Sequence, residues 1–348
     1  MSGRAGRLSA LLVAALAACK PDSTTGTKTY QPPPPSVDLR DPQGILDAIG
    51  GFESTFGLSA LHSATGFAAF LSVPSAPPAP GAAGAPACAA GLPPAAPAAT
   101  FGVFPDSDLG RVFVYDSATR RFVTGADTGG PAGGVEFVLP ALDVLNQVTY
   151  PLQTAGTLTA YDVTPPGGLT TLHTVVSGGG ASADYTFADS GTATAYAGFL
   201  SGWAGGAGKT YGFQDSTTGL YLEVTAAAIL VDSTTGVRMS LNASRTATDA
   251  FDNYYDLDYT FRWTGGKVRL LGAITTYCLL PSIGLTVSVN DTDYAIVNQG
   301  QSGPVVTALD SALTPTQDSA IQALIRGQSE LFSWLTALTQ PARQFLGP

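Results

Sequence analysis

The three cysteines and two histidines of this 348-residue sequence are its most reactive side chains. Cys19 ends the apolar run LLVAALAAC, and Lys20 follows it directly. A thiolate is a nucleophile that is oxidised, binds a metal or is acylated, according to its surroundings. The residues around each cysteine therefore indicate which chemistry it performs.

The residues before Cys19 have the three parts of a secretory signal. Arg4 and Arg7 form a positive region, residues 8–16 form an apolar region, and residues 17–19 are small. A membrane-spanning helix needs about 20 apolar residues, so this run is too short to be one. We therefore predict a signal peptide at 1–18 and an exported protein.

The segment Leu16-Ala17-Ala18-Cys19 resembles the lipobox of bacterial lipoproteins. The resemblance implies a diacylglyceryl group on the Cys19 thiol, cleavage before Cys19 and a further acyl chain, such as palmitate, on the new amino terminus. Two or more chains anchor a protein stably, which implies attachment to a membrane of the bacterial cell envelope. Lys20 differs from the aspartate that retains such proteins in the inner membrane, so the outer membrane is favoured. A plain signal peptide with an unrelated cysteine is the alternative.

Cys88 and Cys278 are the two thiols that lipidation of Cys19 would leave. Thiols of exported proteins commonly form disulfides. A bond between these two would close a long loop and stabilise the fold by about 3 to 5 kcal/mol. Two separately buried cysteines are the alternative, which the sequence leaves open.

No group of residues has the spacing of a catalytic, cofactor-binding or metal site. His62 and His173 lack the spacing of metal ligands, and no G-x-S-x-G motif is present. We therefore expect no cofactor, and we rank a hydrolase that uses either histidine last. Four acidic residues lie close in sequence, but they lack EF-hand spacing and we expect them on a solvated strand face: Asp249, Asp252, Asp256 and Asp258.

The composition favours a β protein and excludes nucleic-acid binding. Charged residues make up 12% of the chain, hydrophobic residues make up 45%, and there are 41 Gly and 25 Pro. This combination is typical of strands joined by turns, rather than of a disordered chain or a helix bundle. The net charge of −10 lacks the basic footprint that nucleic acid requires, and it makes a lipid the expected means of membrane attachment.

The first hundred residues divide into four segments. After the signal, residues 19–40 contain four consecutive prolines and are predicted to be a lipidated, Pro-rich tether. Residues 41–73 are predicted to be helical, with Asp41 as N-cap and Pro42 at the first helical position. Residues 74–100 are a Pro/Ala-rich connection. The apolar residues at helical spacing are Ile45, Leu46, Ile49, Phe52 and Phe56, followed after Gly57 by Leu58, Leu61, Phe67, Phe70 and Leu71.

Residues 101–300 are predicted to form an antiparallel β domain. Apolar and polar residues alternate along several runs, most clearly over 255–263, which gives each strand one apolar and one wet face. Turn signals separate the runs: DSTTG at 215–219 and at 232–236, the related DSATR at 116–120, and three glycines at 178–180. We interpret this pattern as a meander of adjacent strands.

Residues 301–348 are predicted to be helical and to pack on the sheet. Thr314 and Gln317 form a capping box, with Pro315 at the first helical position. One apolar stripe follows, and a helix with such a stripe must bury it. The stripe consists of Ile321, Leu324, Ile325, Gln328, Leu331, Phe332, Leu335 and Leu338.

The predicted fold class is mainly β: a curved antiparallel meander, or half-barrel, covered by N- and C-terminal helices. This order of elements, together with the anchor, resembles the LolA/LolB and LppX carriers of lipoproteins and lipids. The resemblance implies an apolar ligand or lipid held between sheet and helices by a non-enzymatic envelope lipoprotein. The alternative is a structural or protein-interaction lipoprotein with a filled core, whose protein partners the sequence does not identify.

Mass spectrometry of the native, membrane-extracted protein checks the cysteine predictions. We expect an acylated Cys19 as the first residue and a Cys88–Cys278 disulfide. Two free thiols in the denatured, non-reduced mature protein would contradict the disulfide. An unmodified Cys19 would contradict the anchor.

Overall fold

The structure is a computed structural model in which the described residues all belong to one compact unit, Val37–Pro348. These residues are 39, 41–66, 103–126, 129–143, 145–190, 195–220, 223–247, 252–264, 266–277, 280–300, 303–310 and 312–346. The predicted signal peptide, most of the tether, residues 67–73 and the Pro/Ala-rich connection lie outside them.

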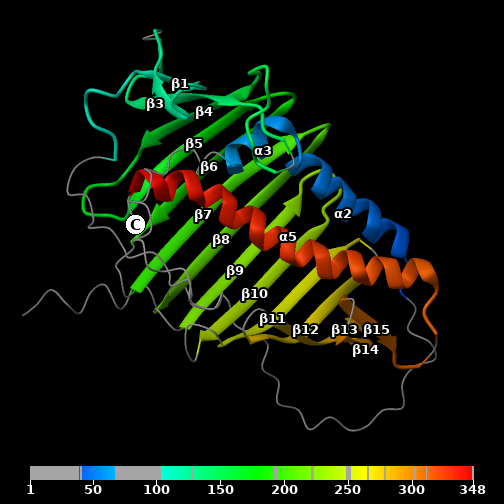
Figure 1. Ribbon diagram of the computed structural model, residues 1–348. Helices are drawn as coiled ribbons and strands as arrows, with labels where there is room; N and C mark the ends of the chain where they lie inside the picture. The colour runs from blue at the N-terminus through cyan, green and yellow to red at the C-terminus, as the bar shows by residue number, and fades with distance from the viewer. Residues whose placement is uncertain are drawn as a thin grey trace, which may run out of the picture. The chain divides into compact units, whose positions relative to one another are not determined.

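Fifteen strands form one open, mostly antiparallel sheet (Figure 1). From β3 to β15, each strand pairs with the next strand of the chain, so this part of the sheet is a meander. At the opposite edge, β1 lies parallel to β3 and antiparallel to β2. Helices precede and follow the strands, which confirms the predicted fold class. The predicted boundary at residue 300 is wrong, because β15 lies within 301–348 and the ladder with β14 extends the sheet by one strand.

The strands have the following bounds: β1 Val112–Asp116, β2 Arg121–Thr124, β3 Gly134–Pro140, β4 Thr154–Asp162, β5 Thr170–Gly178, β6 Ala181–Asp189, β7 Ala195–Gly206, β8 Lys209–Leu220, β9 Glu223–Asp232, β10 Arg238–Ala247, β11 Asp252–Trp263, β12 Gly266–Tyr277, β13 Leu280–Val289, β14 Thr292–Gly300 and β15 Gly303–Ala308.

Three helices, α2 (Pro42–Phe56), α3 (Ser59–Gly66) and α5 (Pro315–Leu346), lie on one face of the sheet (Figure 1). Both predicted caps are confirmed. Asp41 Oδ1 accepts a hydrogen bond from the backbone N–H of Gly44 at 2.8 Å. The backbone N–H of Thr314 donates to Gln317 Oε1 at 2.8 Å, and the N–H of Gln317 donates to Thr314 Oγ1 at 3.3 Å. These bonds satisfy donors that the first helical turn leaves unpaired.

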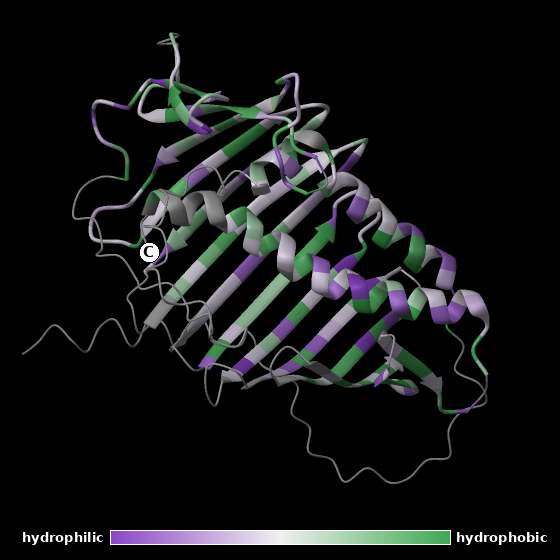
Figure 2. Ribbon diagram, in the orientation of Figure 1, coloured by the Kyte–Doolittle hydropathy of each residue, from purple (hydrophilic) through white to green (hydrophobic). Residues whose placement is uncertain are grey.

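The inner face of the sheet, which we define as the face packed by the helices, is apolar. Hydrophobic and hydrophilic residues alternate along the strands in Figure 2, as the period-two pattern predicts. The buried residues of this face and of the three helices form one continuous cluster. One row across strands β6 to β13 consists of Tyr185, Gly202, Phe213, Leu230, Met239, Phe261, Val268 and Val289.

Two of the three Asp-initiated turn predictions are confirmed. Asp232 accepts hydrogen bonds from the backbone of the turn that follows it, and Gly236 has a φ of 72°. Asp116 makes the equivalent bonds, and Arg120 takes the left-handed position with a φ of 56°. The glycines at 178–180 form the β5–β6 hairpin, also as predicted.

The prediction of a turn at 215–219 is wrong, because this copy of DSTTG lies inside β8. Strand β8 is paired with β7 on one side and β9 on the other along these five residues. The second copy forms the turn between β9 and β10, whereas the first is held extended by two ladders. Strand pairing on both sides therefore outweighs the local preference of these five residues for a turn.

Tyr259 tests the packing of the inner face. Its side chain is fully buried, its hydroxyl has no hydrogen-bond partner in the described part of the chain, and burial raises the pKa of the hydroxyl. Tyr259→Phe removes an unsatisfied polar atom and keeps the ring, so we expect the free energy of unfolding to rise by about 1 kcal/mol in urea titrations. Tyr259→Ala is expected to lower it by about 3 to 5 kcal/mol.

The matched control is Tyr254→Phe, because the Tyr254 side chain is exposed on the opposite face. We expect that variant to change the free energy of unfolding by less than about 0.5 kcal/mol. A lower stability of Tyr259→Phe than of the parent would show that the buried hydroxyl has a partner.

Candidate functional site

Residues of all three helices line an open hollow of about 440 Å³, which we call the helical groove. Its volume is within the range of small-molecule sites. Each helix contributes residues because α2 and α3 pack along α5. The groove is lined by Phe52, Glu53 and Phe56 of α2, His62 and Thr65 of α3, and Glu330, Ser333, Trp334 and Ala337 of α5.

Aromatic rings form one wall of the helical groove. Phe52 and Phe56 lie one turn apart on α2, with ring centroids 4.6 Å apart. The Trp334 ring lies 3.6 Å from Phe56 and 6.2 Å from Phe52. Trp334 also packs edge-on against Phe213 of β8 at 5.2 Å, so the groove is fixed to the inner face of the sheet.

Charged side chains form the opposite rim. Arg326 bonds Glu53 Oε1 through Nη2 at 2.8 Å and through Nε at 2.9 Å. It also approaches Glu330 Oε1 at 3.5 Å. Burial raises the pKa of Glu330 above its usual value, and the charge of the adjacent Glu53 carboxylate and a side-chain hydrogen bond with it raise the pKa further. When both glutamates are ionised, the two carboxylates and one guanidinium leave one net negative charge at the rim.

Two buried polar atoms of the groove residues have no partner within the described ranges: Glu330 Oε2 and Trp334 Nε1. Trp334 is only 9% exposed. One atom is an acceptor and the other a donor, and their residues lie one helical turn apart. Buried polar groups without partners are uncommon and costly, so this pair indicates a place for a bound polar group.

His62 is the one residue weighed for chemistry in the sequence that the structure places in the groove. Its Nε2 lies 3.0 Å from the backbone oxygen of Asp143. Because a carbonyl only accepts, Nε2 carries the hydrogen. Ser333 lines the same groove, but among the described residues no hydrogen bond joins it to His62 and no carboxylate bonds the imidazole. The geometry therefore lacks the bonds of a catalytic triad.

His173 lies on the outer face of the sheet, opposite the helices. Its Nε2 bonds Asp184 Oδ1 at 2.8 Å, and its ring stacks on Tyr161 with centroids 5.7 Å apart. On the same face Arg269 makes two hydrogen bonds to Asp258, of 2.7 and 2.8 Å. Asp258 is thus an ion-pair partner on a strand, as the solvated-face prediction implies.

The remaining predicted site residues cannot be placed. Cys19, Cys88, Cys278 and Asp249 lie outside the described residues, so the anchor and the disulfide stay predictions. Among the side chains that the structure describes, no three His, Cys, Asp or Glu groups converge in the manner of a metal site. Within the described ranges, every helix is too short or too polar to cross a bilayer.

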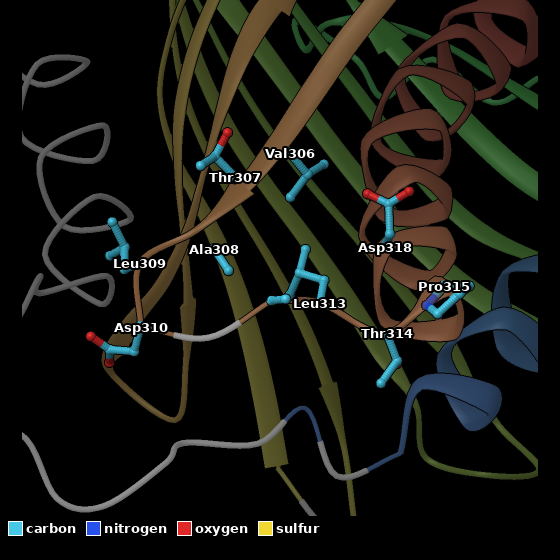
Figure 3. Close-up of a pocket in the computed structure, with 10 residues that line it drawn as sticks. Val306, Thr307, Ala308, Leu309, Asp310, Leu313, Thr314, Pro315 and Asp318 are labelled. Carbon is cyan, nitrogen blue, oxygen red and sulfur yellow. The ribbon is translucent and has the colours of Figure 1, made fainter.

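A second hollow, of about 770 Å³, lies between β15 and the start of α5 (Figure 3). We call it the edge hollow, because β15 is the last strand of the sheet. Its walls are Val306, Thr307, Ala308, Leu309, Asp310, Ala312, Leu313, Thr314, Pro315 and Asp318.

Comparison with known proteins adds no relative. No protein-family model, curated protein or solved structure matches this chain.

The groove residues Glu53, Glu330 and Trp334, and Arg326, which pairs with Glu53, were not predicted from the sequence. Glu53 and Arg326 are 273 positions apart, so only the packing of α2 on α5 brings them together. The one local signal was the i, i+4 spacing of Arg326 and Glu330. That pattern more often marks a solvated helix face.

The raised pKa of Glu330 makes stability depend on pH. A carboxyl whose pKa is raised by folding binds its proton more tightly in the folded state. The free energy of unfolding therefore falls as pH rises from the usual glutamate pKa through the raised one. We expect the parent to lose stability relative to Glu330→Gln across this interval, measured by urea unfolding at a series of pH values between about 4 and 8.

Glu223→Gln is the control, because that carboxylate is exposed on β9, away from the groove. The difference in free energy of unfolding between Glu223→Gln and the parent should not change across the pH interval expected for Glu330. A difference in free energy of unfolding between the parent and Glu330→Gln that stayed constant with pH would show that folding does not raise the pKa of Glu330.

Proposed function

We propose that this protein is an exported, lipid-anchored and non-enzymatic protein of the bacterial cell envelope, and that its helical groove binds an apolar molecule with a hydroxyl-bearing head. The observation that carries this proposal is the unpartnered acceptor and donor pair, Glu330 Oε2 and Trp334 Nε1, beside three aromatic rings. A hydroxyl accepts from the indole N–H and donates to the carboxylate through one oxygen. The rings favour an apolar or sugar-like body next to that hydroxyl.

Charge and location support a lipid as the ligand class. The net charge of −10 and the carboxylates at the rim favour a neutral or cationic head over an anionic one. Acylation of Cys19, which the lipobox resemblance implies, would hold the groove near a membrane. The glycerol or sugar head of a neutral lipid has the required hydroxyls.

A filled core favours the second candidate, a structural or protein-interaction lipoprotein. The buried side chains of α2, α3, α5 and the inner face belong to one cluster. The groove lies among the helices, and the edge hollow lies at the last strand. A ligand deep between sheet and helices, as the carrier resemblance implies, stays a prediction.

Trp334→Phe tests the binding proposal with the full-length protein extracted in detergent. The variant keeps an aromatic ring beside Phe56 but removes Nε1–H. We expect it to weaken binding of glycerol monooleate about tenfold, because the bound hydroxyl loses its donor. Binding of methyl oleate, which has no hydroxyl, should be weaker in the parent and unchanged by the substitution. Native mass spectrometry measures both.

Trp203→Phe is the matched control, because Trp203 is 41% exposed on the outer face. It should leave both affinities unchanged. Equal binding of the two lipids by the parent would contradict the hydroxyl site. Release of free oleate would contradict the non-enzymatic part of the proposal, and Ser333→Ala would then show whether the groove hydroxyl is responsible.

A further inference from the structure

The free side of β15 offers backbone hydrogen-bonding groups. Among the described strands, β15 has β14 as its only neighbour. The N–H of Leu309, just after β15, donates to the backbone oxygen of Tyr294 at 3.1 Å. In an antiparallel ladder, alternate residues bond the same neighbour. Residues 303, 305 and 307 therefore face β14, whereas 304, 306 and 308 direct their N–H and C=O away from it.

One end of this free side is already closed. Pro304 has no N–H, and its carbonyl oxygen accepts from Gln322 Nε2 of α5 at 3.2 Å. Val306 and Ala308 follow, and no hydrogen bond from another described residue covers them. An uncovered row of this kind is a template for an added strand.

The edge hollow lies beside the same residues. Val306 and Ala308 point their side chains to the inner face, and with Leu313 they supply apolar wall. Asp310 and Asp318 are the charged residues among the ten that line the hollow, and both are acidic. Figure 3 shows Asp318 on the first turn of α5 and Val306 on β15, at two sides of the hollow.

We propose that β15 binds an extended segment of another protein as an added antiparallel strand. Side chains alternate along a strand, so two residues of the segment, two positions apart, enter the edge hollow. An apolar side chain fits against Val306 and Leu313, and a lysine or arginine fits Asp318. The backbone provides hydrogen bonds and the hollow provides selectivity, as in other modes of strand addition.

A second copy of this chain is a poorer occupant. Residues 303–309, GPVVTAL, contain no basic residue to meet Asp318. Pairing two β15 strands would also bring two sets of Asp310 and Asp318 close together. Like charges at such an interface oppose association.

The test uses a fluorescent peptide, Thr-Leu-Thr-Lys-Thr-Leu-Thr, and the detergent-extracted full-length protein. In an antiparallel added strand, the residues that enter the hollow also direct their N–H toward Val306 and Ala308. Backbone N-methylation of the central lysine should therefore weaken binding at least tenfold. N-methylation of the threonine next to it should have no effect. Fluorescence anisotropy measures both affinities.

Two protein variants complete the test. Pro304 already lacks an N–H on the free side of β15, and Ala308→Pro removes a second N–H that does not bond β14. We expect this variant also to weaken binding at least tenfold. Asp318→Asn should weaken binding of the lysine peptide but not of a peptide with glutamine at that position. Asp256→Asn, an exposed carboxylate on β11, is the matched control and should change neither affinity.

Several outcomes would overturn the proposal. Equal loss of affinity from either N-methyl group would exclude the added-strand geometry. Unchanged affinity in Asp318→Asn would exclude the charge match. Sedimentation of the protein alone as a dimer that Ala308→Pro dissociates would identify a second copy as the occupant of β15.

Discussion

A sheet fifteen strands wide satisfies its interior backbone polar groups by its own ladders, but it leaves an apolar face that water must not reach. Burial of apolar surface contributes roughly 25 cal/mol per Å², so covering this face dominates the stability of the fold. The long helix α5 runs across this face, together with α2 and α3 (Figure 1). The stripe of α5, including Leu324, Leu331 and Leu338, is buried against the sheet and α2.

The candidate site is a consequence of how this cover is built. Two helices packed side by side leave a groove along their line of contact. The helical groove follows the contact between α2 and α5, and aromatic rings form one wall of it. Glu330 and Trp334 line this groove, and within the described ranges Glu330 Oε2 and Trp334 Nε1 have no hydrogen-bond partner. Buried polar atoms of this kind cost stability unless a partner binds them. Their presence is the reason to regard the groove as more than a packing boundary.

Much of the architecture follows from local patterns. Period-two alternation located the strands around Tyr259 and Met239, and short-range hydrogen bonds made the helix caps at Asp41 and Thr314 predictable. The DSTTG copy at 215–219 shows the limit of such patterns, because the same five residues are a strand when they are paired on both sides and a turn at 232–236. The candidate site was not predictable because it too depends on contacts between residues that are far apart in the sequence. Glu53 and Arg326 meet only through packing, and the free side of β15 depends on which strand is last.

The position of α5 in the sequence also bears on how the chain reaches its native state. Neighbouring strands of the meander are neighbours in the chain, so their ladders close short loops and can form early. The helix that covers them follows every strand, and its ion pair with Glu53 joins residues 273 apart. A partly made sheet would therefore present its apolar face uncovered, a species prone to aggregation.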